Sequence, residues 1–156
     1  MYQRIFIPLD GSKIGEAALP YVEDLMSKLS PEVKVEITLF QVLPPVRRSG
    51  GGEYAIPDIA YTEKQTEENK KKAIDYLNTT GEALRSKGAT VTAKVAIGDA
   101  SGEIAKAAEE INANLIAMST HGRSGLSRWA FGSVTDKVLR REGNVPIVMV
   151  RAPEKA

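Results

Sequence analysis

A segment rich in glycine and hydroxyl groups carries the residues best suited to binding chemistry. It comprises Met118, Ser119, Thr120, His121, Gly122, Arg123, Ser124 and Gly125, and it is closed by Gly132, Ser133 and Val134. Glycines let backbone amides approach an anion closely, and the unpaired N–H groups at a helix N-terminus attract negative charge. The segment therefore predicts a phosphate-binding loop, although the same glycines also fit an ordinary connection between a strand and a helix.

The order of these glycines excludes two common phosphate-binding motifs. The segment matches neither the Walker A pattern nor the dinucleotide fingerprint of a Rossmann turn, so a nucleotide here must be held in another way. His121 is the only histidine of the chain. Because nothing supplies the other members of a triad or of a metal site, we interpret it as a local hydrogen-bonding residue.

Two further candidates lie where predicted strands end. Asp10 ends the first apolar run and is followed at once by Gly11-Ser12. Its carboxylate could accept hydrogen bonds from ribose hydroxyls or help to hold a divalent ion on phosphates, but Asp10 or Ser12 could equally cap the next helix. Val42 offers apolar surface and backbone groups suited to a purine, with plain core packing as the alternative.

Elements that alternate in type position these residues. Short apolar runs predict strands at 5–9, 34–43, 90–97, 114–119 and 146–150. Helical spacing predicts helices at 17–29, at 62–87 behind a capping box of Thr62 and Gln65, from Asp99 or Ser101 to 111, and at 132–141. Pro20 should bend the first helix or loosen its first turns, and residues 44–60 are predicted to form a surface loop. Gly88 is the expected C-cap of the long helix.

This alternation predicts an α/β fold with a mainly parallel sheet in a single domain, residues 1–156. In such sheets the ligands lie beyond the carboxyl ends of the strands, where the strand order reverses. Asp10, Gln41-Val42 and Ser119 to Gly122 all fall at such ends. We expect them to share one crevice.

Composition narrows the class of protein. The chain has 156 residues, 42% of them apolar and 26% charged, a formal net charge of +1 and no cysteine. The near-zero charge gives no reason to expect a nucleic-acid or membrane partner, and the missing thiols exclude disulfides and cysteine nucleophiles. No apolar run approaches the roughly 20 residues that cross a bilayer, and no signal peptide is recognisable, so we expect a cytoplasmic protein.

With these residues assembled, the chain resembles the universal stress protein family over almost its whole length. Residues 4–12, Gly98-Asp99 with the helix and strand that follow, and the glycine pattern carry the resemblance. The pattern of ATP-binding members is a glycine, two residues, a glycine, nine residues, then a glycine followed by serine or threonine. It falls here on Ser119, Gly122 and Gly132-Ser133, with serine in place of the first glycine. Serine is small, so a ribose or a phosphate could still approach closely, and the hydroxyl could donate to it.

The resemblance implies a doubly wound parallel sheet of five strands in the order 3-2-1-4-5, with helices on both faces. It also implies a homodimer through the last strand, Val145 to Arg151, and ATP with Mg²⁺ or Mn²⁺ as ligand. Adenine would lie near Pro8, Leu9 and Val42, ribose near Asp10, and the phosphates on Gly122, Gly132, Ser133 and Val134. Asp10 would meet the metal ion only indirectly, through ATP.

The expected function is that of an ATP-binding regulatory protein of the stress response, a binding module with at most slow ATP hydrolysis. No residue is predicted to be catalytic, because Asp10 and Arg123 are present without a convincing base for phosphoryl transfer. One alternative is a dimeric interaction protein that binds no nucleotide, which the serine at position 119 favours. Another is an ATP pyrophosphatase or nucleotidyl transferase, although Leu9 to Ser12 match its expected loop poorly.

Overall fold

The computed structural model describes residues 2–45, 59–120, 133–140 and 143–153. Its strands are β1 (Tyr2–Pro8), β2 (Lys34–Leu43), β3 (Thr90–Ile97), β4 (Leu115–Thr120) and β5 (Ile147–Arg151). Its helices are the 3-10 turn η1 (Gly15–Ala17), α1 (Ala18–Ser27), α2 (Ile59–Ser86), α3 (Ala100–Glu110) and α4 (Ser133–Arg140). Within the described ranges, no helix combines the length and apolar character needed to cross a bilayer.

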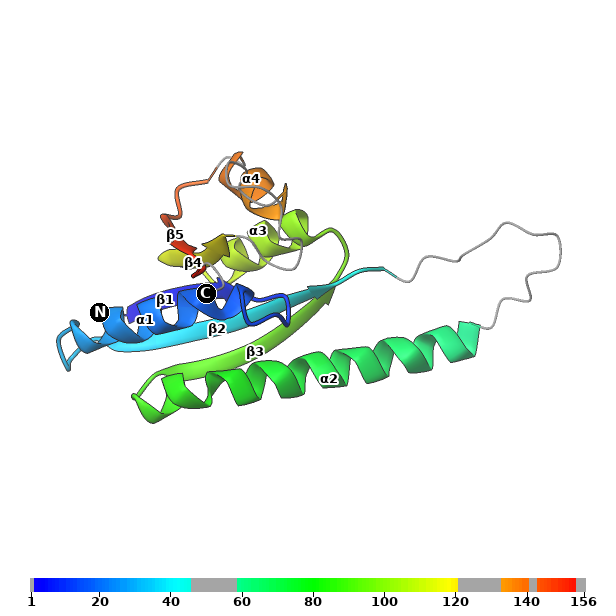
Figure 1. Cartoon of the computed structure of the whole chain (residues 1–156), viewed down its shortest axis with the longest axis horizontal. Helices are drawn as coiled ribbons and strands as arrows, with labels where there is room; N and C mark the ends of the chain where they lie inside the picture. The colour runs from blue at the N-terminus through cyan, green and yellow to red at the C-terminus, as the bar shows by residue number, and fades with distance from the viewer. Residues whose placement is uncertain (1, 46–58, 121–132, 141–142, 154–156) are drawn as a thin grey trace.

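The five strands form one parallel sheet in the order β3-β2-β1-β4-β5, as expected. Helices α1 and α2 cover one face and α3 and α4 the other (Figure 1). Because β1 is central, alternate β1 side chains are buried on opposite faces. Ile5 and Ile7 join the cluster beneath α1 and α2, whereas Phe6 packs with Phe40 beneath α3.

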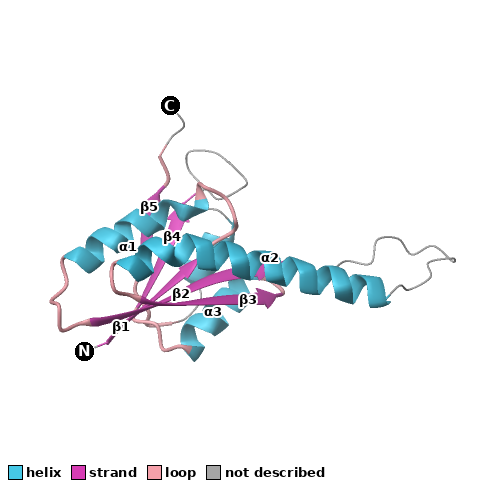
Figure 2. Cartoon of the chain, turned by 90° about the horizontal axis from the view of Figure 1, so that it is seen from below, coloured by secondary structure: helices cyan, strands magenta, loops and turns pink. Residues whose placement is uncertain are grey.

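The long helix α2 differs from its predicted start. It begins at Ile59, so the capping box expected at Thr62 and Gln65 was wrong, and the loop expected to reach residue 60 ends earlier. In the sequence Pro57-Asp58 directly precede Ile59, and aspartate is favoured just before a helix, so the chain carries an earlier start signal. The first part of α2 extends past the sheet (Figure 2).

The other helix boundaries follow local chemistry. Gly88 adopts a φ of 97° and its N–H bonds to the Arg85 carbonyl, which confirms it as the residue that ends α2. Asp99 caps α3 by accepting a hydrogen bond from the Gly102 N–H. The first helix is split into η1 and α1, with Pro20 in the first turn of α1. Proline is tolerated there because those N–H groups lack helical partners.

Candidate functional site

The strands β1 and β4 part from each other at the carboxyl edge of the sheet. Between β1 and β2, pairing runs to Pro8 and Phe40 and continues with a 2.7 Å bond from the Leu9 N–H to the Phe40 carbonyl. Between β1 and β4, only Ile5–Leu115 and Phe6–Ile116 are paired. This is also where the strand order reverses, the place at which such sheets bind ligands.

A tight turn after β1 holds the carboxylate of Asp10 at this opening. Asp10 Oδ1 accepts hydrogen bonds from the Ser12 N–H at 2.9 Å and from the Ser12 hydroxyl at 2.6 Å. The Ser12 Oγ in turn accepts the Gly15 N–H at 3.0 Å. Neither of the two capping residues considered from the sequence occupies the N-cap position of the next turn, which is Ile14. Ser12 accepts the N–H of the first residue of that turn, and Asp10 orients Ser12.

Gly15 lies directly against this carboxylate. A Cβ built on Gly15 would collide with Asp10 Oδ1 and would lie 3.1 Å from Ser12 Oγ. Its backbone does not need a positive φ. Glycine is therefore required here by close approach and not by backbone conformation.

Helix α2 supports the same turn from the other side. The Tyr76 hydroxyl donates to Glu16 Oε1 at 2.9 Å, and the Glu16 side chain is only 17% exposed. Burial, the hydrogen bond to Glu16 and the nearby charges of Glu16 and Asp10 raise the pKa of the Tyr76 phenol above its ordinary value. No local pattern predicts this contact, since residues 16 and 76 are 60 residues apart in the chain.

Ser119 does not present its hydroxyl to the opening. Its Oγ donates to the Gly15 carbonyl at 2.7 Å and accepts the Ala18 N–H at 3.0 Å. From the sequence we expected this hydroxyl to be able to donate to a ribose or a phosphate. A hydroxyl can donate only one hydrogen bond, and here it donates that bond to the Gly15 carbonyl.

The remaining predicted site residues divide into four groups. Pro8, Leu9 and Val42 lie at the ends of neighbouring strands, Leu9 buried at 5% exposure and the other two half-buried. Met118 is also 5% exposed and packs in the core beneath α3 and α4, so a ligand could reach only its backbone. Ser133 and Val134 begin α4. His121, Gly122, Arg123, Gly125 and Gly132 lie outside the described residues.

Two buried polar atoms lie at this edge, on residues that the sequence placed at strand ends without giving their side chains a role. Gln41 Oε1 at the end of β2 and Thr120 Oγ1 at the end of β4 have no hydrogen-bond partner among the residues that the structure describes. The Gln41 amide nitrogen would lie 3.6 Å from a Cβ on Gly11, which places it beside the Asp10 turn. Buried polar atoms without partners are uncommon, and both flank the end of β1.

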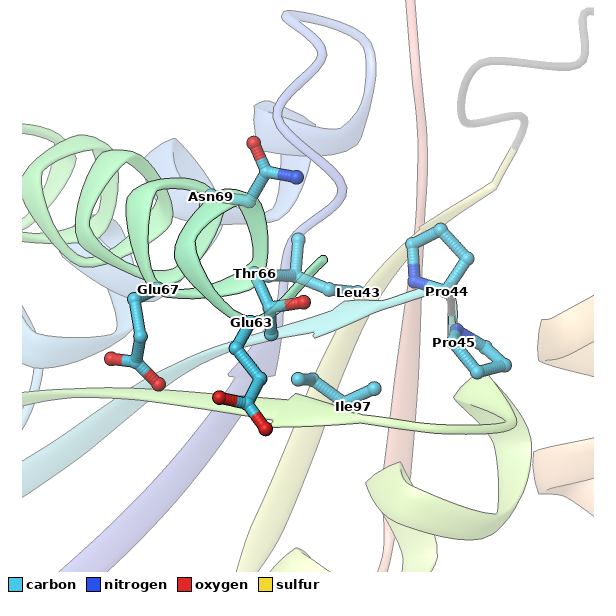
Figure 3. A pocket seen from close by; sticks show the side chains of 8 residues that line it. All are labelled: Leu43, Pro44, Pro45, Glu63, Thr66, Glu67, Asn69 and Ile97. Atoms are coloured by element: carbon cyan, nitrogen blue, oxygen red, sulfur yellow. The ribbon is translucent and has the colours of Figure 1, made fainter. Parts of the chain in front are cut away.

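A separate cavity lies on the β3 side of the same edge. Its volume is about 260 Å³, and its walls come from the ends of β2 and β3 and the first turns of α2 (Figure 3). It is lined by Leu43, Pro44, Pro45, Glu63, Thr66, Glu67, Asn69 and Ile97. None of these is basic and two are acidic, so the cavity does not suit a phosphate group. We do not place the nucleotide site there.

A metal cage built from protein side chains is also missing from this part of the molecule. Among the described residues, no group of three or more histidine, aspartate or glutamate side chains lies close enough to hold an ion. Any divalent ion at the Asp10 turn would therefore depend on ligand oxygens.

Comparison with known proteins agrees with this architecture. The model of the universal stress protein family matches residues 1–151. The chain is 27% identical to universal stress protein MJ0531 of Methanocaldococcus jannaschii over 155 residues, which make up 99% of this chain and 85% of that protein.

Solved structures show the same fold. The structure of protein MJ0577, also from Methanocaldococcus jannaschii, superposes with a TM-score of 0.79 at 24% identity, covering 99% of each chain. A universal stress protein family protein from Arabidopsis thaliana, solved with AMP bound, gives a TM-score of 0.64 at 16% identity over 97% of this chain and 92% of that one. The family match spans nearly the whole sequence, and this chain belongs to the universal stress protein family.

Proposed function

We propose that this protein binds an adenine nucleotide, in the form of ATP with Mg²⁺ or Mn²⁺, where β1 and β4 part. The observation that carries the proposal is the Asp10 turn, whose carboxylate is fixed by Ser12 beside the point where strand pairing stops. Family membership supports it, as does a fold relative that has AMP bound.

Each predicted residue except Ser119, whose hydroxyl bonds to Gly15 and Ala18, has a direct part in this proposal. Asp10 accepts hydrogen bonds from the ribose hydroxyls, and Pro8, Leu9 and Val42 lie along the adenine. The phosphates lie on the backbone of the loop after β4 and the start of α4, with contacts from Met118, His121, Gly122, Arg123, Gly125, Gly132, Ser133 and Val134. The divalent ion is held by the phosphates, because the described residues supply no cage for it.

The proposed role is regulatory binding with at most slow hydrolysis. Efficient phosphoryl transfer needs a residue that orients the nucleophile, metal carboxylates and a charged clamp. Asp10 is the one carboxylate at the end of β1, and it is engaged by Ser12. The bound nucleotide would thus report the energy state of the cell to this protein, which we expect in the cytoplasm. It would not serve mainly as a substrate.

The dimer predicted from the sequence belongs to the same proposal. Strand β5 is an edge of the sheet, and its apolar residues from Ile147 to Val150 are half-buried in the single chain. An exposed apolar edge strand favours pairing with another strand. We therefore place the homodimer contact along Val145 to Arg151.

The first test identifies the ligand directly. Protein purified without added nucleotide is denatured, and the released small molecules are weighed by mass spectrometry. Saturation with ATP and magnesium at 100 times Kd should stabilise the fold by about 2.7 kcal/mol, which raises Tm by about 5–11 °C for a chain of this size.

Asp99 provides a matched control for Asp10. It also follows a strand and accepts a hydrogen bond from the serine two residues later, Ser101, at 2.7 Å, but it lies at the end of the edge strand β3. Asp10→Asn should weaken ATP binding about tenfold, the effect of losing about 1.4 kcal/mol from a charged hydrogen bond. Asp99→Asn should leave affinity within about twofold.

Three outcomes would contradict the proposal. Neither released nucleotide nor a shift in Tm at millimolar ATP would favour the interaction protein that binds no nucleotide. Equal losses in Asp10→Asn and Asp99→Asn would show that the site lies elsewhere. Conversion of ATP to AMP and pyrophosphate would favour the pyrophosphatase or transferase class.

A further inference from the structure

The hydroxyl of Ser119 connects two parts of the chain that the sheet does not join. Strand pairing between β1 and β4 stops at Phe6 and Ile116, although β4 continues to Thr120. Beyond that point the Ser119 hydroxyl reaches the carbonyl of Gly15 and the N–H of Ala18, more than 100 residues earlier in the sequence. We propose that Ser119 is a positioning residue that fixes the Asp10 turn for the nucleotide; this rests on the function proposed above.

Three hydrogen bonds, linked through the backbone of Gly15 and the hydroxyl of Ser12, lead from Ser119 to the Asp10 carboxylate. Ser119 Oγ donates to the Gly15 carbonyl, the Gly15 N–H donates to Ser12 Oγ, and the Ser12 hydroxyl donates to Asp10 Oδ1, at 2.7, 3.0 and 2.6 Å. Both Gly15 and Ala18 are buried, Ala18 fully. The chain therefore crosses from β4 to the end of β1 through well-packed backbone.

The direction of each bond is determined by the number of protons. A serine hydroxyl donates one hydrogen bond and accepts others. The Ser12 hydroxyl donates its one hydrogen bond to Asp10, so towards Gly15 its oxygen acts as the acceptor of the N–H. In the same way the Ser119 hydroxyl donates to the Gly15 carbonyl, and its oxygen accepts the Ala18 N–H. The Gly15 carbonyl and the Gly15 N–H belong to successive peptide groups, so the two bonds are coupled through the position of the Gly15 backbone, and loss of the first should weaken the last.

Close packing adds a second, steric link. Gly15 lies so near Asp10 that no side chain fits between them. A shift of the Gly15 peptide group, once released by Ser119, would thus change the space available to the carboxylate. Alanine or glycine at position 119 would remove the side-chain partner of the Gly15 carbonyl and of the Ala18 N–H, both of which lie in buried backbone.

The test compares two nucleotides that differ only where Asp10 is proposed to act. Titration calorimetry measures Kd of the wild type and of Ser119→Ala for ATP and for 2′,3′-dideoxy-ATP, which lacks both ribose hydroxyls. We expect Ser119→Ala to weaken ATP binding about three- to tenfold and to leave dideoxy-ATP binding within about twofold. Ser101→Ala removes a buried hydroxyl that donates to Asp99 at the start of α3, away from the Asp10 turn, and it should change neither affinity.

Other outcomes overturn the inference. If the wild type binds ATP and Ser119→Ala binds it equally well, Ser119 does not position Asp10. If Ser119→Ala weakens both nucleotides equally, Ser119 supports the edge of the sheet in general and not the ribose contact. Retained ATP affinity in Ser119→Thr, which keeps the hydroxyl, would support the inference.

A measurement without ligand separates this inference from the proposed function. If the wild type fails to bind ATP, the proposed function fails, and amide hydrogen exchange then decides on Ser119 alone. Faster exchange of the Ser12 and Gly15 N–H groups in Ser119→Ala, with unchanged exchange in the centre of β2, supports the positioning chain. Unchanged exchange at Ser12 and Gly15 overturns it.

Discussion

Gly15→Ala tests whether the Asp10 carboxylate is held as tightly as the contacts indicate. Position 15 lies in a 3-10 turn without a positive φ, where replacing glycine by alanine ordinarily stabilises a protein by about 0.4–1 kcal/mol. Here the new methyl group would collide with Asp10 Oδ1 and crowd Ser12 Oγ. The sign of the effect therefore depends on whether the carboxylate can move away freely.

The expected magnitude follows from the contacts that must change. Overpacking costs about 1–3 kcal/mol, and the loss of one hydrogen bond to the charged Asp10 costs about 1.5 kcal/mol more at this half-buried position. After the entropic gain of alanine is subtracted, we expect a destabilisation of about 3 kcal/mol. For a chain of this size that lowers Tm by about 6–12 °C.

Urea unfolding followed by circular dichroism measures the effect, with Gly143→Ala as the matched control. A Cβ on Gly143 meets nothing within 4 Å, so that variant should stay within about 0.5 kcal/mol of the wild type. In an Asp10→Ala background the cost of Gly15→Ala should nearly vanish, which gives a coupling energy of about 1.5 kcal/mol or more. Wild-type or higher stability of Gly15→Ala would refute the reasoning, because the carboxylate would then be free to turn away.

Three further predictions use other contacts. Gly81→Ala in α2 should lower the free energy of unfolding in urea by about 1 kcal/mol, because its Cβ would lie 2.9 Å from Val91 and 3.1 Å from Leu39. This crowding outweighs the higher helix propensity of alanine, and a gain in stability would show that the two side chains move away. The folded state raises the pKa of Tyr76, so its contribution to the free energy of unfolding is fully present below about pH 10 and is lost progressively above it. The difference in unfolding free energy between the wild type and Tyr76→Phe should therefore be constant from about pH 7 to 9 and shrink above about pH 10. Val148→Lys should give monomers by light scattering at micromolar concentration without loss of the fold, and persistent dimers would move the contact away from β5.

The architecture was predictable because its signals are local. Apolar runs and helical spacing placed every strand within a few residues, and the strand order came with the family resemblance. Gly88 and Asp99 were recognisable as helix caps because their bonds reach only three to five residues along the chain. The start of α2 was misplaced because two capping signals lie close together, and the one at Thr62 matched the longer pattern.

The arrangement around Asp10 could not be predicted in the same way. The roles of Ser119 and Tyr76 depend on partners 104 and 60 residues away, and these pairs meet only after the sheet and the helices have packed. From the sequence, serine at position 119 was interpreted as a small substitute for glycine whose hydroxyl faces the ligand. In the structure its hydroxyl instead bonds to the turn and helix start at Gly15 and Ala18, and no spacing in the sequence reveals that contact.

The short pairing between β1 and β4 divides the sheet into two unequal panels. Seven residue pairs join β1 to β2 and eight join β2 to β3, but two join β1 to β4. Strand pairing is shortest along that line, and β5, with the edge on which a second subunit is proposed to dock, belongs to the smaller panel. A ligand bound between β1 and β4 would hold the two panels of the sheet together. Its binding would therefore change the stiffness of the distant edge strand β5.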